Sequence, residues 1–256
     1  MITDSFDNKS RPFLTSKTFY GQEERNDLVC LVTFKQKVLE YAIEKYNGKL
    51  YKQYKTTNGY QEIYILNVED KQYLMYMTPI GATVASTIMD EVCSVCGTHQ
   101  FIYFGSCGVL DERKCRHKVI VPTSSYRDEG ISYHYYPASD YIEVRNGEKL
   151  FSILEKLGVP CVKGPIWTTD AIYMETMDKI KKRKEEGALA VEMEVSGVEA
   201  VARYLNISNY HFLFGADSLD GTEWDRSDLG GDPELKLQIE SFEIALRVAS
   251  ELKKAQ

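Results

Sequence analysis

The chain has 256 residues, of which 43% are hydrophobic, and this is enough to build one sizeable core. Its net charge of −7, from 31 basic and 38 acidic residues, argues against nucleic acid as the main partner. The first residues lack the basic-then-apolar order of a signal peptide, and no apolar run approaches the roughly 18 residues that a membrane span needs. We therefore expect a soluble, cytoplasmic protein without a membrane partner.

Apolar runs and turn residues predict alternating strands and helices after a polar N-terminal arm of residues 1–26. Strands are expected at residues 28–33, 49–55, 60–68, 72–77, 101–105, 118–124, 162–168, 188–192 and 210–217. Helices are expected at residues 34–46, 82–96, 148–157, 173–186, 195–204 and 233–254. This alternation indicates a layered α/β single domain with a mixed sheet over residues 27–256.

A glycine-rich turn follows the strand at residues 101–105. Gly105, Ser106, Cys107 and Gly108 could present successive backbone N–H groups to an anion, and glycine lets a planar ligand lie against the backbone. A lone G-x-x-G is a weak pattern, so it carries little weight alone. The C-x-x-C of residues 93–96 is interpreted as two small residues at a helix end rather than a metal site, because no second such pair exists.

Two glutamates stand where a short strand becomes a helix. Glu192 and Glu194 flank Met193, and on a strand-like segment residues two apart face the same way. Paired carboxylates can accept hydrogen bonds from a vicinal diol such as the 2′ and 3′ hydroxyls of a ribose, with Met193 as an apolar surface between them. The alternative is two acids at a helix start, stabilised by the helix dipole. The residues alone leave both interpretations open.

Asp217 ends the apolar run of residues 212–216. A carboxyl group at the mouth of a hydrophobic strand loses solvent, which raises its pKa and suits it to general acid catalysis. A capping or turn aspartate is the alternative. Arg226 follows after a loop that contains Trp224. It is either a partner that tunes the charge of Asp217 or an exposed loop arginine.

Taken in this order, three blocks resemble the nucleoside phosphorylase-I family, which includes purine nucleoside phosphorylases, uridine phosphorylases and nucleosidases. The blocks are F-G-S-C-G at 104–108, V-E-M-E-V-S-G at 191–197 and the strand that ends in Asp217. T-T-D-A-I-Y-M-E-T at 168–176 is similar to the family's base-pocket segment, and R-D-E-G-I-S-Y-H-Y-Y-P at 127–137 to its uridine-phosphorylase-like branch. The resemblance covers residue 28 to the C-terminus. It implies a three-layer α/β/α sandwich with a twisted, partly closed mixed sheet, assembled as a homodimer or as a hexamer of three dimers.

The resemblance also implies residue roles. Glu194 would hold the ribose hydroxyls, with Met193 against the sugar and Glu192 beside it. Asp217 would protonate a purine at N7, assisted by Arg226. The other implied contacts are phosphate binding by Thr33, Gly105 and Ser106, and base binding by Cys107, Gly108, Ile172 and Tyr173.

The chain departs from the family on the phosphate side. Residues 32–36 read V-T-F-K-Q where phosphorylases usually carry G-D-P-x-R, and Tyr103 stands where an arginine is usual. Two missing guanidinium groups remove much of the bidentate phosphate binding, which Lys35, Lys55 or Arg127 would have to replace. The nucleosidases place a catalytic glutamate in the first loop, and this chain has none there.

Our first hypothesis is phosphorolysis of the N-glycosidic bond of purine-leaning ribonucleosides in nucleotide salvage. The products would be a free base and ribose 1-phosphate. Inorganic phosphate would be the co-substrate, and no metal or other cofactor is expected. Hydrolysis of the same bond by water and a non-catalytic nucleoside-binding protein are the alternatives.

Overall fold

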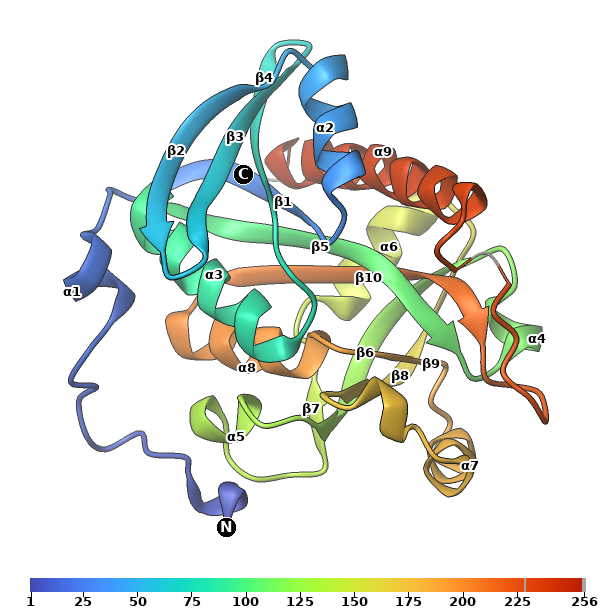
Figure 1. Ribbon diagram of the computed structural model, residues 1–256. Coiled ribbons are helices and arrows are strands. Elements are labelled where there is room, and N and C mark those ends of the chain that lie inside the picture. Colours follow the sequence, from blue (N-terminus) through green and yellow to red (C-terminus); the bar gives the residue numbers. More distant parts are fainter. Residues whose placement is uncertain (228, 255–256) are drawn as a thin grey trace.

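The computed structural model describes residues 1–227 and 229–254; Asp228, Ala255 and Gln256 of the predicted domain lie outside the described residues. A ten-stranded mixed sheet forms its centre, with strand order β10-β6-β8-β9-β5-β1-β4-β3-β2 and β7 beside β6 (Figure 1). A further pairing of β10 with β5 closes part of the sheet on itself. The fold class predicted from the sequence, helices layered around a partly closed mixed sheet, is confirmed.

The elements follow the predicted order. The strands are β1 (Asn26–Thr33), β2 (Lys49–Thr56), β3 (Gly59–Val68), β4 (Lys71–Met77), β5 (Thr98–Val109), β6 (Val119–Asp128), β7 (Tyr141–Glu143), β8 (Cys161–Thr169), β9 (Ala190–Glu192) and β10 (Ser208–Ser218). The α-helices are α1 (Ser16–Tyr20), α2 (Gln36–Lys45), α3 (Ala82–Cys96), α4 (Glu112–Cys115), α5 (Ser132–Tyr135), α6 (Gly147–Lys156), α7 (Met177–Glu185), α8 (Val195–Leu205) and α9 (Asp232–Lys254). Two short 3-10 helices are η1 (Ile2–Asp4) and η2 (Ile172–Met174).

Two differences from the predicted elements bear on the site. β5 continues past Gly105 to Val109, because β10 pairs with it through this segment and β9 pairs with it at Gly108 and Val109. The helix predicted over residues 173–186 is divided into η2 and α7, and the side chain of Thr176 caps α7. The N-terminal arm has little regular structure, as expected, and contains the short elements α1 and η1.

Apolar side chains fill both faces of the sheet. On one face, Phe104 and Phe212 pack with Phe242 of α9 and with apolar residues of α2 and α6. On the other face, Tyr103 packs with Met89 of α3 and apolar residues of α8. Fully burying one such large side chain contributes about 1.5–3 kcal/mol, so these two clusters account for the layered arrangement.

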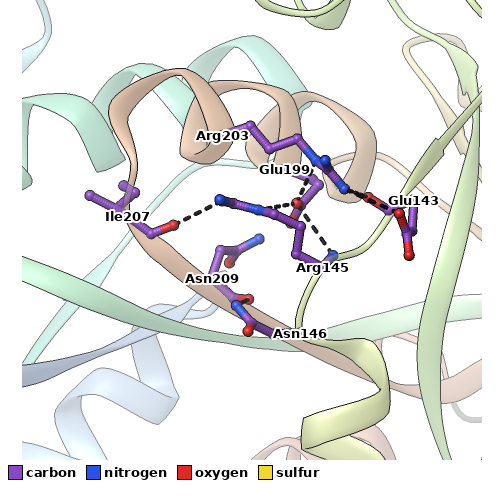
Figure 2. A network of polar contacts seen from close by, with 7 residues as sticks. All are labelled: Glu143, Arg145, Asn146, Glu199, Arg203, Ile207 and Asn209. Carbon is purple, nitrogen blue, oxygen red and sulfur yellow. Dashed lines mark hydrogen bonds and ion pairs between the residues drawn. The ribbon is translucent and has the colours of Figure 1, made fainter.

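A buried polar network holds α8 in place (Figure 2). The Glu199 carboxylate, with none of its surface exposed, accepts hydrogen bonds from Arg145 Nε at 2.9 Å and Arg203 Nε at 3.0 Å. Arg145 also donates to the Ile207 carbonyl, so the turn after β7 is tied both to α8 and to the residue that precedes β10. Because Glu194 immediately precedes α8, this anchoring also fixes the backbone position of Glu194.

No helix of the described chain is long and apolar enough to cross a membrane.

Candidate functional site

The glycine-rich end of β5 is the centre of the candidate site, because three other strands meet it. β1 and β10 run parallel to β5, with Val32 opposite Tyr103 and Gly215 opposite Cys107. β9 runs antiparallel to β5 with Val191 opposite Gly108, so the chain after β9 returns along the glycine-rich segment. The three sequence blocks that suggested a site therefore come together at one edge of the sheet, the usual place for ligands in such folds.

Both glycines of the segment are needed for close packing. A Cβ atom at Gly105 would lie 3.0 Å from a ring carbon of Phe34, and one at Gly108 would lie 2.4 Å from Leu219 Cδ1. The same position at Gly108 is 3.5 Å from Asp217 Oδ1. Gly108 thus faces the predicted acid, and the Leu219 side chain packs closely against the same glycine.

Ser106 and Cys107, between these glycines, and Thr33 on β1 differ in their burial and in their hydrogen-bond partners. The Cys107 thiol is buried and donates to the Phe214 carbonyl at 3.4 Å, so only the backbone of Cys107 can face a ligand. Ser106 is partly exposed. Thr33 is buried, and its hydroxyl oxygen accepts from the Lys35 backbone N–H at 3.3 Å.

Glu192 acts on its own polypeptide chain. Its Oε2 accepts from the backbone N–H groups of Glu194 at 2.7 Å and Val195 at 2.9 Å, and its Oε1 accepts from Thr168. The two glutamates do not act as one face, because the strand ends at Glu192 and the alternation of a strand ends with it. The helix-start interpretation therefore describes Glu192, whose carboxylate satisfies N–H groups that the start of α8 leaves without partners.

Glu194 is the buried carboxylate that remains at the sheet edge. Only 7% of the residue is exposed, and its Oε1 accepts from the Gly81 backbone N–H at 2.6 Å. Burial raises the pKa of Glu194 and of Glu192, and the negative charge of Glu194 raises that of Glu192 further. Met193 between them is partly buried.

Asp217 has a different partner from the predicted one. Burial raises the pKa of Asp217, although a 2.7 Å hydrogen bond from Trp224 Nε1 to Oδ2 opposes this. Arg226 is exposed and donates to the Leu229 carbonyl at 3.1 Å. The predicted pairing of Arg226 with Asp217 is therefore corrected: Asp225 bridges back to Ser218, and this turn brings Trp224 to the acid.

The segment predicted to bind the base lies at the surface, and it contains an acid that the sequence analysis did not single out. Ile172 is 48% exposed and Tyr173 is 96% exposed, so neither packs over a base position in this structure. Glu175 is partly buried, and burial followed by the charge of Asp217 raises its pKa to about 7. Its signal was its place in the T-T-D-A-I-Y-M-E-T block.

Two of the three cations proposed to replace the missing arginines are engaged elsewhere. Arg127 is buried and donates to the Ser132 hydroxyl and to the carbonyls of Tyr136, Pro137 and Ser139, so it ties down its own loop. Lys35 Nζ pairs with Glu234 at 3.3 Å. Lys55 is exposed near the end of β2.

Aromatic rings occupy the side where the resemblance implies phosphate. The Tyr103 ring stacks on His211 with centroids 4.6 Å apart, and its hydroxyl lies 3.1 Å from that of Tyr76. Phe34 lies 6.2 Å from Tyr103, between ring centroids. Burial lowers the pKa of His211 to about 3, so this ring is neutral and adds no positive charge.

Two further findings limit what the site can hold. Among the described residues, no group of three or more His, Cys, Asp or Glu side chains is placed to hold a metal ion. A cavity of about 690 Å³ lies between β10, α4 and α9, lined among others by Phe214, Ala216 and Ser241. Residues 192–194 do not line this cavity, so we do not assign the sugar to it.

Comparisons with known proteins agree with this architecture. The family described as "Phosphorylase superfamily" matches residues 29–251. A DeoD-type purine nucleoside phosphorylase of Alkaliphilus metalliredigens (strain QYMF) is 28% identical over 145 residues, which are 56% of this chain and 62% of that protein. One from Thermoanaerobacter sp. (strain X514) is 26% identical over 185 residues, 70% of this chain and 78% of that protein.

A solved structure of a futalosine hydrolase mutant of Helicobacter pylori strain 26695 has a TM-score of 0.69 to this chain. The match covers 87% of this chain and 98% of that one at 13% sequence identity. At this identity the likeness concerns the fold alone. The chain spans less than two thirds of the length of the Alkaliphilus relative, at 62%.

Proposed function

Because this chain belongs to the phosphorylase superfamily, we propose that it cleaves the N-glycosidic bond of a ribonucleoside at the edge where β5, β9 and β10 meet. The observation that carries the proposal is the buried Glu194 carboxylate beside the glycine-rich end of β5. A buried carboxylate can accept two hydrogen bonds from a ribose diol, and such bonds favour its ionised form against the effect of burial. Gly81 would hold one of its oxygens while the sugar binds.

Asp217 is the proposed acid for the leaving base. Cleavage passes through an oxocarbenium-like sugar, and the departing base must gain a proton or a hydrogen bond. Asp217 Oδ1 faces Gly108, and burial raises the pKa of Asp217 toward the range where a carboxyl group can donate a proton. A purine, which offers N7 to such an acid, is the base class that this arrangement favours.

Phosphorolysis is the first candidate for the second half of the reaction. The relatives that match the sequence are named purine nucleoside phosphorylases. Phosphate would lie against the backbone of Gly105 and Ser106, on the side of Thr33. It would attack the sugar to give ribose 1-phosphate. Backbone N–H groups can bind an anion without a cationic side chain.

Hydrolysis is the second candidate, and the surroundings of Tyr103 favour it. Tyr103 stands where a guanidinium group is usual, with the rings of Phe34 and His211 beside it, and Arg127 and Lys35 are engaged elsewhere. Water is a neutral nucleophile, so it requires no cationic site. Positioning and electrostatic stabilisation by the two acids would then supply most of the rate enhancement.

The test is release of free base from inosine, adenosine, guanosine and uridine, with and without millimolar phosphate. Release that requires phosphate, with ribose 1-phosphate as the second product, identifies a phosphorylase. Equal release in both conditions identifies a nucleosidase. Binding of these nucleosides without any release would refute the enzymatic proposal and favour a nucleoside-binding protein. The Asp217→Asn variant is the control for contaminating activity.

We also propose that the working form is a homodimer or a hexamer of three dimers. Exposed apolar side chains gather beside the site at Ile172, Tyr173, Met174 and Met177, and such surface is a common mark of a protein interface. Light scattering measures the assembly directly, and a monomer at working concentration would contradict the proposal.

A further inference from the structure

The contact between Trp224 and Asp217 carries an inference beyond the assignment of the acid. Trp224 Nε1 donates to Asp217 Oδ2 at 2.7 Å. Across residues 1–227 and 229–254, no other side chain donates a hydrogen bond to this carboxylate. The carboxylate thus has one oxygen bound by an indole and the other, Oδ1, directed toward Gly108.

The chain itself fixes the indole in this position. Ser218 and Asp225 exchange backbone hydrogen bonds of 2.9 and 3.0 Å, which closes the loop that carries Trp224 back onto the end of β10. Trp224 is nevertheless 59% exposed, so packing against a core does not explain the orientation of its indole. The hydrogen bond to Asp217 is its identified polar contact.

An indole N–H has two properties that matter for a proton donor. It is a donor only, and it carries no charge. The oxygen that accepts this bond is the poorer site for the acidic proton, so a protonated Asp217 would carry its proton on Oδ1. A guanidinium in the same place would favour the ionised carboxylate much more strongly, because opposite charges lower the pKa of an acid.

We propose that Trp224 is a positioning residue that directs the transferable proton of Asp217 to Oδ1, the oxygen that faces the base site. The inference rests on the proposed function, since it supposes that Asp217 protonates a leaving base. It specifies the substrate as a nucleoside whose base accepts a proton at a ring nitrogen near Gly108.

The electrostatic surroundings of Asp217 are acidic. Asp225 and Glu234 raise the pKa of Asp217, and Asp217 in turn raises that of Glu175. Lys179 lies near Glu175 and acts to lower the pKa of Glu175. The Trp224 hydrogen bond is the largest influence that lowers the pKa of Asp217, so its removal shifts this pKa upward.

Tryptophan fluorescence tests the contact without any substrate. The chain has two tryptophans, and the second, Trp167, is buried and donates to Asp128 at 3.2 Å. We expect the emission of the wild-type protein to change with pH as Asp217 titrates. This change should be absent from Asp217→Asn and from Trp224→Phe, whereas the Trp167 signal persists in both. A transition that survives in Asp217→Asn but is lost in Trp224→Phe would overturn the assignment, because it would come from Trp224 without Asp217.

Paired substrates test the role. Inosine needs a proton on its leaving base, whereas 7-methylguanosine already carries a positive charge on its base and needs none. Trp224→Phe should lower kcat for inosine about 10- to 100-fold, the usual scale for a misplaced general acid, and leave 7-methylguanosine nearly unchanged. Glu223→Gln, an exposed change in the same loop, is the matched control and should affect neither substrate.

The outcomes separate the two proposals. An equal loss on both substrates would mean that Trp224 has a merely structural role and would refute the inference. If the wild-type protein releases no base from either nucleoside, the proposed function fails, and the positioning role fails with it. The fluorescence titration would still decide whether the indole binds Asp217.

Discussion

Replacing Glu194 by glutamine is the sharpest test of the proposed sugar site. The two side chains have nearly the same shape, and the amide oxygen of glutamine can still accept the Gly81 N–H that Glu194 Oε1 accepts at 2.6 Å. The negative charge is lost, however. The variant therefore removes the charge-assisted part of any bond to the ribose hydroxyls while the local backbone contact is kept.

The expected magnitude follows from hydrogen bonding. Bonds to charged groups contribute about 1.5–3 kcal/mol and neutral ones about 0.5–1.5 kcal/mol, so two diol bonds lose roughly 2–3 kcal/mol in Glu194→Gln. This corresponds to a fall of about 30- to 150-fold in kcat/KM for a ribonucleoside. A 2′,3′-dideoxynucleoside has no diol to lose, so its kcat/KM should change far less.

The assay compares kcat/KM for inosine and 2′,3′-dideoxyinosine in the two proteins. Glu192→Gln is the matched control, since Glu192 is equally buried but bonds to its own chain. Equal losses on both substrates in Glu194→Gln would refute the view that this carboxylate binds the diol. A ribose-selective loss in Glu192→Gln would move the role to the other glutamate.

Three further predictions concern stability. Glu192→Gln should lower the free energy of unfolding by about 1–3 kcal/mol in urea. Two backbone N–H groups lose a charged acceptor, and the amide nitrogen would face the Thr168 hydroxyl, which now donates to Oε1. Glu199→Ala should lower the free energy of unfolding by about 3–5 kcal/mol, since the partly buried Arg145 and Arg203 lose their shared carboxylate (Figure 2). A smaller loss than in Glu192→Gln would contradict the anchoring role of Glu199. Burial and, next, the charge of Asp217 raise the pKa of Glu175 from 4.5 to about 7 in the folded chain. As pH rises, the unfolded chain therefore loses this proton at a lower pH than the folded chain does. The stabilisation that the protonated carboxyl gives at acid pH is lost as pH rises through 7. The wild-type Tm should therefore fall more steeply than that of Glu175→Gln between these two pH values, and parallel curves would argue against the shift.

The sequence predicts the order of elements well, because apolar runs and turn residues act locally. It also predicts that the glycine-rich segment, the glutamates and Asp217 meet, since strand ends converge at one edge in this architecture. It does not separate Glu192 from Glu194, because the period of a strand holds only while the strand lasts. The partner of Asp217 depends on the bridge between Ser218 and Asp225, which no residue pattern in the sequence predicts.

Burial explains the other differences between the predicted and the observed site. Arg127 was a candidate for phosphate binding because it is a cation near the predicted pocket. In the folded chain it is 2% exposed, and backbone carbonyls of its own loop accept its hydrogen bonds. Such a role depends on how the loop closes around the side chain, which the sequence does not specify.

The aromatic rings around Tyr103 bear directly on how phosphate would bind. Hydrogen bonds to charged groups contribute about 1.5–3 kcal/mol each, so the absence of two guanidinium contacts removes about 3–6 kcal/mol of phosphate binding. That is a factor of roughly 10² to 10⁴ in affinity. Backbone N–H groups at Gly105 and Ser106 would have to restore it for a phosphorylase to saturate at low phosphate. Water as the nucleophile needs no such contacts. The dependence of base release on phosphate concentration therefore measures how well this edge of the sheet binds phosphate.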